Sequence, residues 1–178
     1  MVKKESTKRL ALDLGCGPNK REGFIGVDIM QFDGKVDIVH DLRKKWPWKN
    51  NSVDEVHCSH TIEHFTNIER IHVFNELYRV MKLEAKSLII VPHWSSIRAY
   101  GDLTHQWPPI SEFFWYYLAR DWRKINAPHV PLICNFESTW GYSISPLWQT
   151  KNQESQQFAL AHYKEVAQDT IATLTKKA

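Results

Sequence analysis

The segment Leu12-Asp13-Leu14-Gly15-Cys16-Gly17 ends an apolar run that starts at Arg9. A short apolar run that stops at glycines is typical of a buried strand leading into a tight turn. Glycine adopts backbone angles at such turns that other residues avoid. The sequence therefore predicts a strand over residues 9–14 and a tight turn directly after it.

Four further short runs rich in β-forming residues follow this strand, at residues 24–28, 36–40, 53–59 and 87–91. Between the last two runs, apolar residues recur every three or four positions, at Ile62, Phe65, Ile68 or Ile71, Phe74, Leu77 and Met81. This spacing predicts one long helix with an apolar face that lies on a sheet. Strands that alternate with crossover segments indicate a parallel α/β sheet.

The first two connections of this pattern are short. Phe24 comes only seven positions after Gly17, and Val36 only eight after Asp28. A parallel crossover that contains a full helix takes about 10 to 12 residues or more. We therefore expect these two crossover helices to be cut to a turn or absent, and the sheet to be less covered on one side.

The chain changes character after Pro92, where Pro, Trp, His and Ser dominate up to Pro109. We expect residues 93–131 to be an insertion over the sheet, in which Ser111 caps a helix that reaches Arg120 or Trp122. Residues 134–145 are interpreted as a strand pair or one long strand, and residues 153–164 as a helix. Residues 167–175 fit either a helix end or a final strand.

The composition is that of a globular protein and not of a membrane-spanning or disulfide-rich one. A chain of 178 residues with 43% hydrophobic and 24% charged residues is typical of one globular domain. The three cysteines, Cys16, Cys58 and Cys134, lack the spacing of a zinc site or a disulfide framework and are expected to be reduced thiols. The start of the chain does not resemble a secretion signal, so we expect a cytoplasmic protein without membrane association. A net charge of +3 does not by itself indicate a nucleic-acid partner.

Five motifs occur in an order that identifies a resemblance: residues 12–17, Gly26-Val27-Asp28, His40-Asp41-Leu42, Asn51-Ser52-Val53-Asp54-Glu55-Val56, and Glu76-Leu77-Tyr78-Arg79-Val80-Met81-Lys82. Over residues 9–92, the chain resembles the class I S-adenosylmethionine-dependent methyltransferases. The resemblance implies a single Rossmann-like α/β domain over residues 1–178. Its mostly parallel sheet would have about seven strands, the last one or two antiparallel. Residues 1–92 would form the cofactor-binding half, and residues 93–178 the substrate-side insertion and the C-terminal strands.

The resemblance also implies S-adenosylmethionine as cofactor and assigns residues to it. Asp28 would accept from the ribose hydroxyls, and Asp41 from the adenine amino group. Asp13 would lie near the methionine ammonium, and Ser59 and His60 would border the methionine portion. The expected cofactor-binding residues are Asp13, Leu14, Gly15, Cys16, Gly17, Asp28, Ile29, Asp41, Leu42, Ser59 and His60.

Two positions depart from the family pattern. Asn19 replaces the third small residue of the glycine loop, although asparagine tolerates left-handed backbone better than most residues. Leu83-Glu84-Ala85-Lys86 stands where the family often has Pro-Gly-Gly. The second departure leaves the start of the fifth strand open.

The methyl acceptor is expected to lie beside residues 93–116, because these follow the carboxyl end of the fifth strand. Within this segment we predict that His93, Asp102 and His105 assist catalysis, with Asp102 orienting a histidine that accepts a proton. We expect a small-molecule acceptor, while RNA or protein acceptors and a homodimer stay open. The alternative for this segment is a surface loop in which Asp102 only forms a turn.

The sequence also contains patterns typical of other classes of protein. His60-Thr61-Ile62-Glu63-His64 matches the pattern of inverted zinc peptidases, which would make the protein a zinc-dependent hydrolase. No third ligand is identifiable, and we assign no metal ligand from the sequence. A nicotinamide dehydrogenase would need glycine where Lys20 stands and an acid later than Asp28. A non-catalytic protein that binds S-adenosylmethionine is the third alternative.

Overall fold

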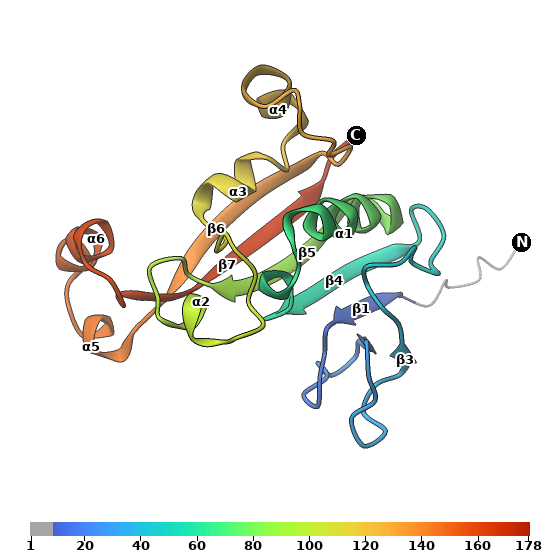
Figure 1. Ribbon diagram of the computed structural model, residues 1–178, viewed down its shortest axis with the longest axis horizontal. Coiled ribbons are helices and arrows are strands. Elements are labelled where there is room, and N and C mark those ends of the chain that lie inside the picture. Colours follow the sequence, from blue (N-terminus) through green and yellow to red (C-terminus); the bar gives the residue numbers. More distant parts are fainter. Residues whose placement is uncertain (1–8) are drawn as a thin grey trace, which may run out of the picture.

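The computed structural model describes residues 9–178, which form a seven-stranded sheet in the order β3-β2-β1-β4-β5-β7-β6 (Figure 1). The strands are β1 (Ala11–Leu14), β2 (Ile25–Asp28), β3 (Ile38–Val39), β4 (Val53–Ser59), β5 (Met81–Pro92), β6 (Phe136–Ile144) and β7 (Ala167–Lys176). Strands β1 to β5 are parallel to one another, whereas β7 is antiparallel to both β5 and β6. This sheet confirms the predicted mostly parallel architecture with antiparallel C-terminal strands.

The helices are η1 (Ile62–His64, a 3-10 helix), α1 (Asn67–Val80), α2 (Arg98–Gly101), α3 (Glu112–Tyr116), α4 (Arg120–Asn126), α5 (Pro146–Gln149) and α6 (Gln153–His162). In the described chain, no helix lies between β1 and β2 or between β2 and β3, as the short spacings predict. Hydrogen bonds hold these two connections instead. The amide of Gly26 donates to the Asp37 carboxylate over 2.7 Å, and Lys20 pairs with that carboxylate at 2.9 Å.

The long helix starts later than its apolar spacing predicts. Thr66 and Glu69 form a capping box at its N-terminus, and this box separates α1 from η1. The two side chains accept hydrogen bonds from amides that have no partner within the helix. The helix can therefore begin after Thr66, and the preceding residues are not part of it. Helix α1 ends at Val80 and β5 begins at once, six residues before the predicted strand at residue 87.

The second half of the chain resolves two open predictions. Residues 136–144 form one long strand rather than a strand pair, and residues 167–176 form the final strand rather than a helix end. The predicted helix after Ser111 is divided into α3 and α4, and Ser111 occupies the cap position without a capping side-chain hydrogen bond. Helix α6 begins at Gln153 as predicted, with Asn152 accepting from the Ser155 amide.

One face of the sheet carries most of the core. In register across the sheet, the buried residues Cys58, Ile89 and Ala172 lie side by side and pack with Phe74 of α1 and Trp115 of α3. Phe74 of α1 and Phe114 of α3 meet with ring centroids 5.2 Å apart, so the two helices lie next to each other (Figure 1). The next register row, His57, Leu88 and Thr173, points to the opposite face and is only half-buried. The opposite face of the sheet is therefore the side that is less covered, as predicted from the short first two connections.

All three cysteines are buried and free, in agreement with the predicted reduced thiols. Among residues 9–178, the structure has no helix long and apolar enough to span a membrane.

Candidate cofactor-binding site

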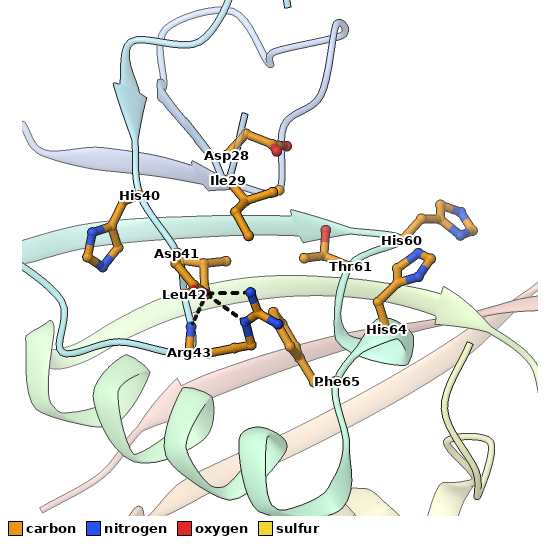
Figure 2. Close-up of a pocket in the computed structure, with 11 residues that line it drawn as sticks. Asp28, Ile29, His40, Asp41, Leu42, Arg43, His60, Thr61, His64 and Phe65 are labelled. Carbon is orange, nitrogen blue, oxygen red and sulfur yellow. Dashed lines mark hydrogen bonds and ion pairs between the residues drawn. The ribbon is translucent and has the colours of Figure 1, made fainter. Parts of the chain in front are cut away.

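A cavity of about 340 Å³ opens at the carboxyl ends of β1, β2 and β4 (Figure 2). Open parallel sheets bind their ligands at this edge. The residues that line the cavity are Gly15, Asp28, Ile29, His40, Asp41, Leu42, Arg43, His60, Thr61, His64 and Phe65. Figure 2 shows His40 at one end of this cavity and the rings of His60 and His64 at the other.

The turn after β1 depends on glycine at one position in particular. Gly15 has a φ of +66°, and a Cβ atom there would overlap the side chain of Thr61. A larger residue would therefore be strained in its backbone and would also displace the wall of the cavity. The Gly15 amide donates to the Val27 carbonyl over 2.7 Å, which fixes the turn against the end of β2.

Asp28 joins the glycine turn to the cavity. One of its carboxylate oxygens accepts from the Gly17 amide at 2.9 Å, and the other accepts from the Met30 amide at 3.3 Å. Each carboxylate oxygen has more than one acceptor position, so both retain capacity for a ligand hydroxyl. Asp28 can therefore hold the turn and bind two neighbouring hydroxyls together.

Asp41 lies farther along the cavity and is paired within the chain. The Arg43 guanidinium donates to both Asp41 oxygens, over 2.8 and 3.1 Å, as Figure 2 shows. These hydrogen bonds with Arg43 hold the pKa of Asp41 below its ordinary value. A ligand at this position therefore meets an ion pair rather than a lone carboxylate, with the buried Leu42 beside it.

The remaining predicted cofactor residues support the cavity from outside its lining. Asp13 is only 3% exposed, and its carboxylate bonds the His57 Nδ1 at 2.6 Å and the Arg21 amide at 2.7 Å. It thus anchors the chain after the glycine turn. Leu14 and Cys16 are also buried, Gly17 donates to the lining residue Asp28, and Ser59 directly precedes the lining residue His60. Burial raises the pKa of the Cys16 thiol to about 11, with Asp13 and Asp28 adding to the shift.

The predicted site lacked five residues that line the cavity: His40, Arg43, Thr61, His64 and Phe65. All five are within two positions of a predicted cofactor residue or of Glu63 in the peptidase-like motif. These residues could therefore have been found by including the sequence neighbours of each predicted residue. Which side chains point into the cavity was not readable, because residues 40–43 and 60–65 have no regular periodicity.

His93 is built into a closed network away from this cavity. It is 3% exposed, and its Nε2 bonds Glu112 at 2.9 Å while its Nδ1 accepts from the Ser95 amide at 3.2 Å. The Tyr142 hydroxyl donates to the same carboxylate at 3.0 Å. The hydrogen bond from His93 lowers the pKa of Glu112 to about 2, and burial with Glu112 nearby raises the pKa of Tyr142 to about 12. Both nitrogens of His93 are therefore engaged, unlike those of a free proton acceptor.

The expected pairing of Asp102 with His105 is wrong. The Asp102 carboxylate accepts from the amide and the hydroxyl of Thr104, at 2.7 and 2.6 Å, because a short turn brings Thr104 back onto it. His105 Nδ1 instead bonds the Ala99 carbonyl at 3.2 Å. Asp102 therefore forms a turn, as in the alternative interpretation of this segment as a surface loop.

The peptidase-like motif also has a different geometry from the one its spacing predicts. Only residues 62–64 are helical, in η1, and His60 precedes them with a φ of 52°. His60 and His64 therefore do not share one face of an α-helix. The His60 Nδ1 lies 3.3 Å from Glu63 Oε1, and this carboxylate raises the pKa of His60.

Part of the chain matches a known protein family. A family model described as a methyltransferase domain matches residues 26–89, which contain Asp28, Asp41 and the His60–His64 segment. No curated protein sequence matches the chain significantly.

Three solved structures share the fold. A SAM-dependent methyltransferase from Archaeoglobus fulgidus is 22% identical, with a TM-score of 0.69 over 96% of this chain and 87% of that one. The cyclase SpnF is 15% identical, with a TM-score of 0.57 over 96% and 75%.

The third is phosphoethanolamine N-methyltransferase 2 from Haemonchus contortus in complex with S-adenosyl-L-methionine. It is 16% identical, with a TM-score of 0.52 over 97% of this chain and 49% of that one. The cofactor predicted from the sequence is thus the one named for two of these three structures. The chain therefore has the Rossmann-like fold of the class I S-adenosylmethionine-dependent methyltransferases, and its residues 26–89 match the methyltransferase domain family.

Proposed function

We propose that the protein binds S-adenosylmethionine in the 340 Å³ cavity and transfers its methyl group to a small-molecule acceptor. The observation that carries the proposal is Asp28, whose carboxylate lines the cavity at the end of β2 while it holds the glycine turn. The methyltransferase domain match over residues 26–89 and the fold support it.

Within the cavity, each part of the cofactor has suitable residues. Asp28 would hold the ribose hydroxyls, and Leu42 with the Asp41–Arg43 pair would border the adenine. His60 and Thr61 would border the methionine portion at the other end. S-adenosylmethionine supplies a sulfonium-bound methyl group, and the chain contributes chiefly by aligning acceptor and methyl group.

The acceptor would enter from the insertion. A second cavity, of about 450 Å³, is lined by Trp94, Ser95, Ser96, Ile97, Tyr100, Lys164 and Glu165. Its size fits a small molecule better than an RNA or a protein segment. Of the three residues predicted to assist catalysis, we retain His105, since His93 and Asp102 are committed to other contacts. The three free cysteines favour a reducing compartment such as the cytoplasm.

Calorimetry with S-adenosylmethionine tests the binding step. We expect one site per chain, and about tenfold weaker binding by Asp28→Asn, because the ribose hydroxyls lose a charged acceptor. Asp33→Asn is the matched control, since Asp33 is an exposed carboxylate outside the cavity with a φ of 46° that asparagine tolerates. Equal affinity of wild type and Asp28→Asn would contradict the assigned site.

Turnover needs its own test, because the cyclase SpnF shows that this fold also serves another reaction. The measurement is formation of S-adenosylhomocysteine with a panel of small-molecule acceptors. Methylated product would support a transferase. Tight cofactor binding without product across small-molecule, RNA and protein acceptors would favour a non-catalytic binding protein.

A further inference from the structure

A second cluster of polar side chains adjoins the His60 end of the cofactor cavity. It consists of Glu63 and His64 from η1 and His105 from the segment after α2. One nitrogen of each histidine and one carboxylate oxygen of Glu63 lie within 4.8 Å of one another. His64 also lines the cofactor cavity, so the cluster and the cavity share a wall.

The Glu63 carboxylate is buried and accepts no well-aligned hydrogen bond, although His60 Nδ1 lies 3.3 Å from its Oε1. The residue is 5% exposed, and neither of its carboxylate oxygens accepts a hydrogen bond from any residue between 9 and 178. The neighbouring Arg70 does not satisfy it, because that guanidinium donates to the carbonyls of Ile62, Glu63, Gln106 and Pro108. A buried carboxylate in this condition is unfavourable unless a cation or a donor completes its surroundings.

The hydrogen bonds of the two histidines fix which nitrogen is free. Thr104 donates its only hydroxyl proton to Asp102 at 2.6 Å, so it must accept from His64 Nδ1 at 2.8 Å. His105 Nδ1 must donate to the Ala99 carbonyl, which can only accept. In the neutral form of each ring the proton is therefore on Nδ1, and the lone pair that can bind a metal ion is on Nε2. The rings meet edge to face with centroids 4.7 Å apart.

We propose that Glu63, His64 and His105 bind a divalent transition metal ion such as zinc. Two imidazole nitrogens and one carboxylate oxygen form the donor set of many three-ligand zinc sites. The contacts of Thr104 and Ala99 correspond to the outer hydrogen bonds that orient metal-binding histidines. Zinc holds such ligands at about 2.0 to 2.2 Å, so binding would draw the three donors together.

This site differs from the one suggested by the peptidase-like motif. His105 replaces His60 as the second imidazole, and it comes from a distant segment of the chain. A metal ion on His105 would take the lone pair that a proton acceptor needs, so in the metal-bound protein His105 is a ligand and not a catalytic base. Asp28 and Asp41, which carry the proposed cofactor contacts, are not among its ligands, so zinc binding and cofactor binding can be tested with different variants.

The test is calorimetry of chelator-treated protein with zinc chloride, followed by the same titration of His105→Ala and Glu63→Gln. We expect one zinc ion per chain for the wild type and at least tenfold weaker binding for each variant. His129→Ala is the matched control, because His129 is exposed and lies outside the cluster, and it should bind zinc as the wild type does. Magnesium chloride should bind far more weakly, since magnesium prefers oxygen ligands.

Two results would overturn the proposal: no saturable one-to-one zinc binding by the wild type, or binding that His105→Ala does not weaken. Thermal unfolding is measured for every variant, and if Glu63→Gln does not fold, His105→Ala decides the question alone. The same chelated preparation is titrated with S-adenosylmethionine. Cofactor binding without zinc binding would reject the metal site and leave the proposed function intact.

Discussion

Glu63 and Glu112 are two glutamates beside histidines at the same edge of the sheet, yet their surroundings are opposite. Glu112 accepts hydrogen bonds from His93, Trp94 and Tyr142. Glu63 is more deeply buried and accepts no well-aligned hydrogen bond from the described residues, with His60 Nδ1 3.3 Å from its Oε1. A carboxylate whose bonds are complete stabilises the fold, whereas one whose bonds are missing is available for a ligand. The difference therefore separates a structural cluster from a candidate functional one.

The largest expected effect comes from breaking the closed cluster. His93→Ala should lower the free energy of unfolding by about 2 to 4 kcal/mol, because it leaves Glu112 and Ser95 without their partner and opens a cavity. Denaturant unfolding measures this loss. Affinity for S-adenosylmethionine should stay within about twofold of the wild type, since His93 does not line the cofactor cavity. If His93→Ala is as stable as the wild type but binds S-adenosylmethionine much more weakly, the His93 cluster is functional and not structural.

A pH series sharpens the same comparison. The folded-state pKa of Glu112 is lowered from 4.5 to about 2, chiefly by His93, so this interaction stabilises the protein above its unfolded pKa. The stabilisation is lost as pH falls through the folded value. Glu112→Gln should therefore be less stable than wild type by about 1 to 2 kcal/mol at pH 6, after allowance for solvent screening.

This gap should shrink between about pH 4.5 and about pH 2, where the wild-type carboxylate takes up its proton. Thermal unfolding of both proteins across that range measures it. A gap that stays constant with pH would mean that the charge of Glu112 contributes nothing.

The smallest effect is expected at Asp41, a carboxylate between the two extremes because Arg43 occupies part of its bonding capacity. Asp41→Ala should weaken S-adenosylmethionine binding by less than about 1 kcal/mol, since water can replace the carboxylate next to adenine. Calorimetry beside Asp28→Asn provides the comparison. If Asp41→Ala loses more affinity than Asp28→Asn, then the ribose lies beside Asp41 and the adenine beside Asp28, contrary to the assignment.

Much of the fold was predictable because it rests on local signals. The glycine turn after Leu14, the acid at Asp28 and the short spacings before Phe24 and Val36 were all readable and fix the order of the first strands. Helix α1 starts later than its apolar spacing predicts, although Thr66 and Glu69 have the spacing of a capping box that marks its true start.

The site was predictable where one residue follows a strand and unpredictable where distant segments meet. Asp28 and His60 line the cavity because each ends or follows a strand that faces it. The approach of His105 to Glu63 and the enclosure of His93 by Glu112 depend on how the insertion folds over the sheet. No periodicity in residues 93–111 encodes that path.

A crystal structure with bound S-adenosylhomocysteine tests the central claim most directly. The account predicts the ribose hydroxyls on the Asp28 carboxylate, the adenine beside Leu42 and Asp41, and the sulfur toward His60 and Thr61. A ligand bound outside the cavity at the ends of β1, β2 and β4, or bound in it with adenine at His60, would contradict the account.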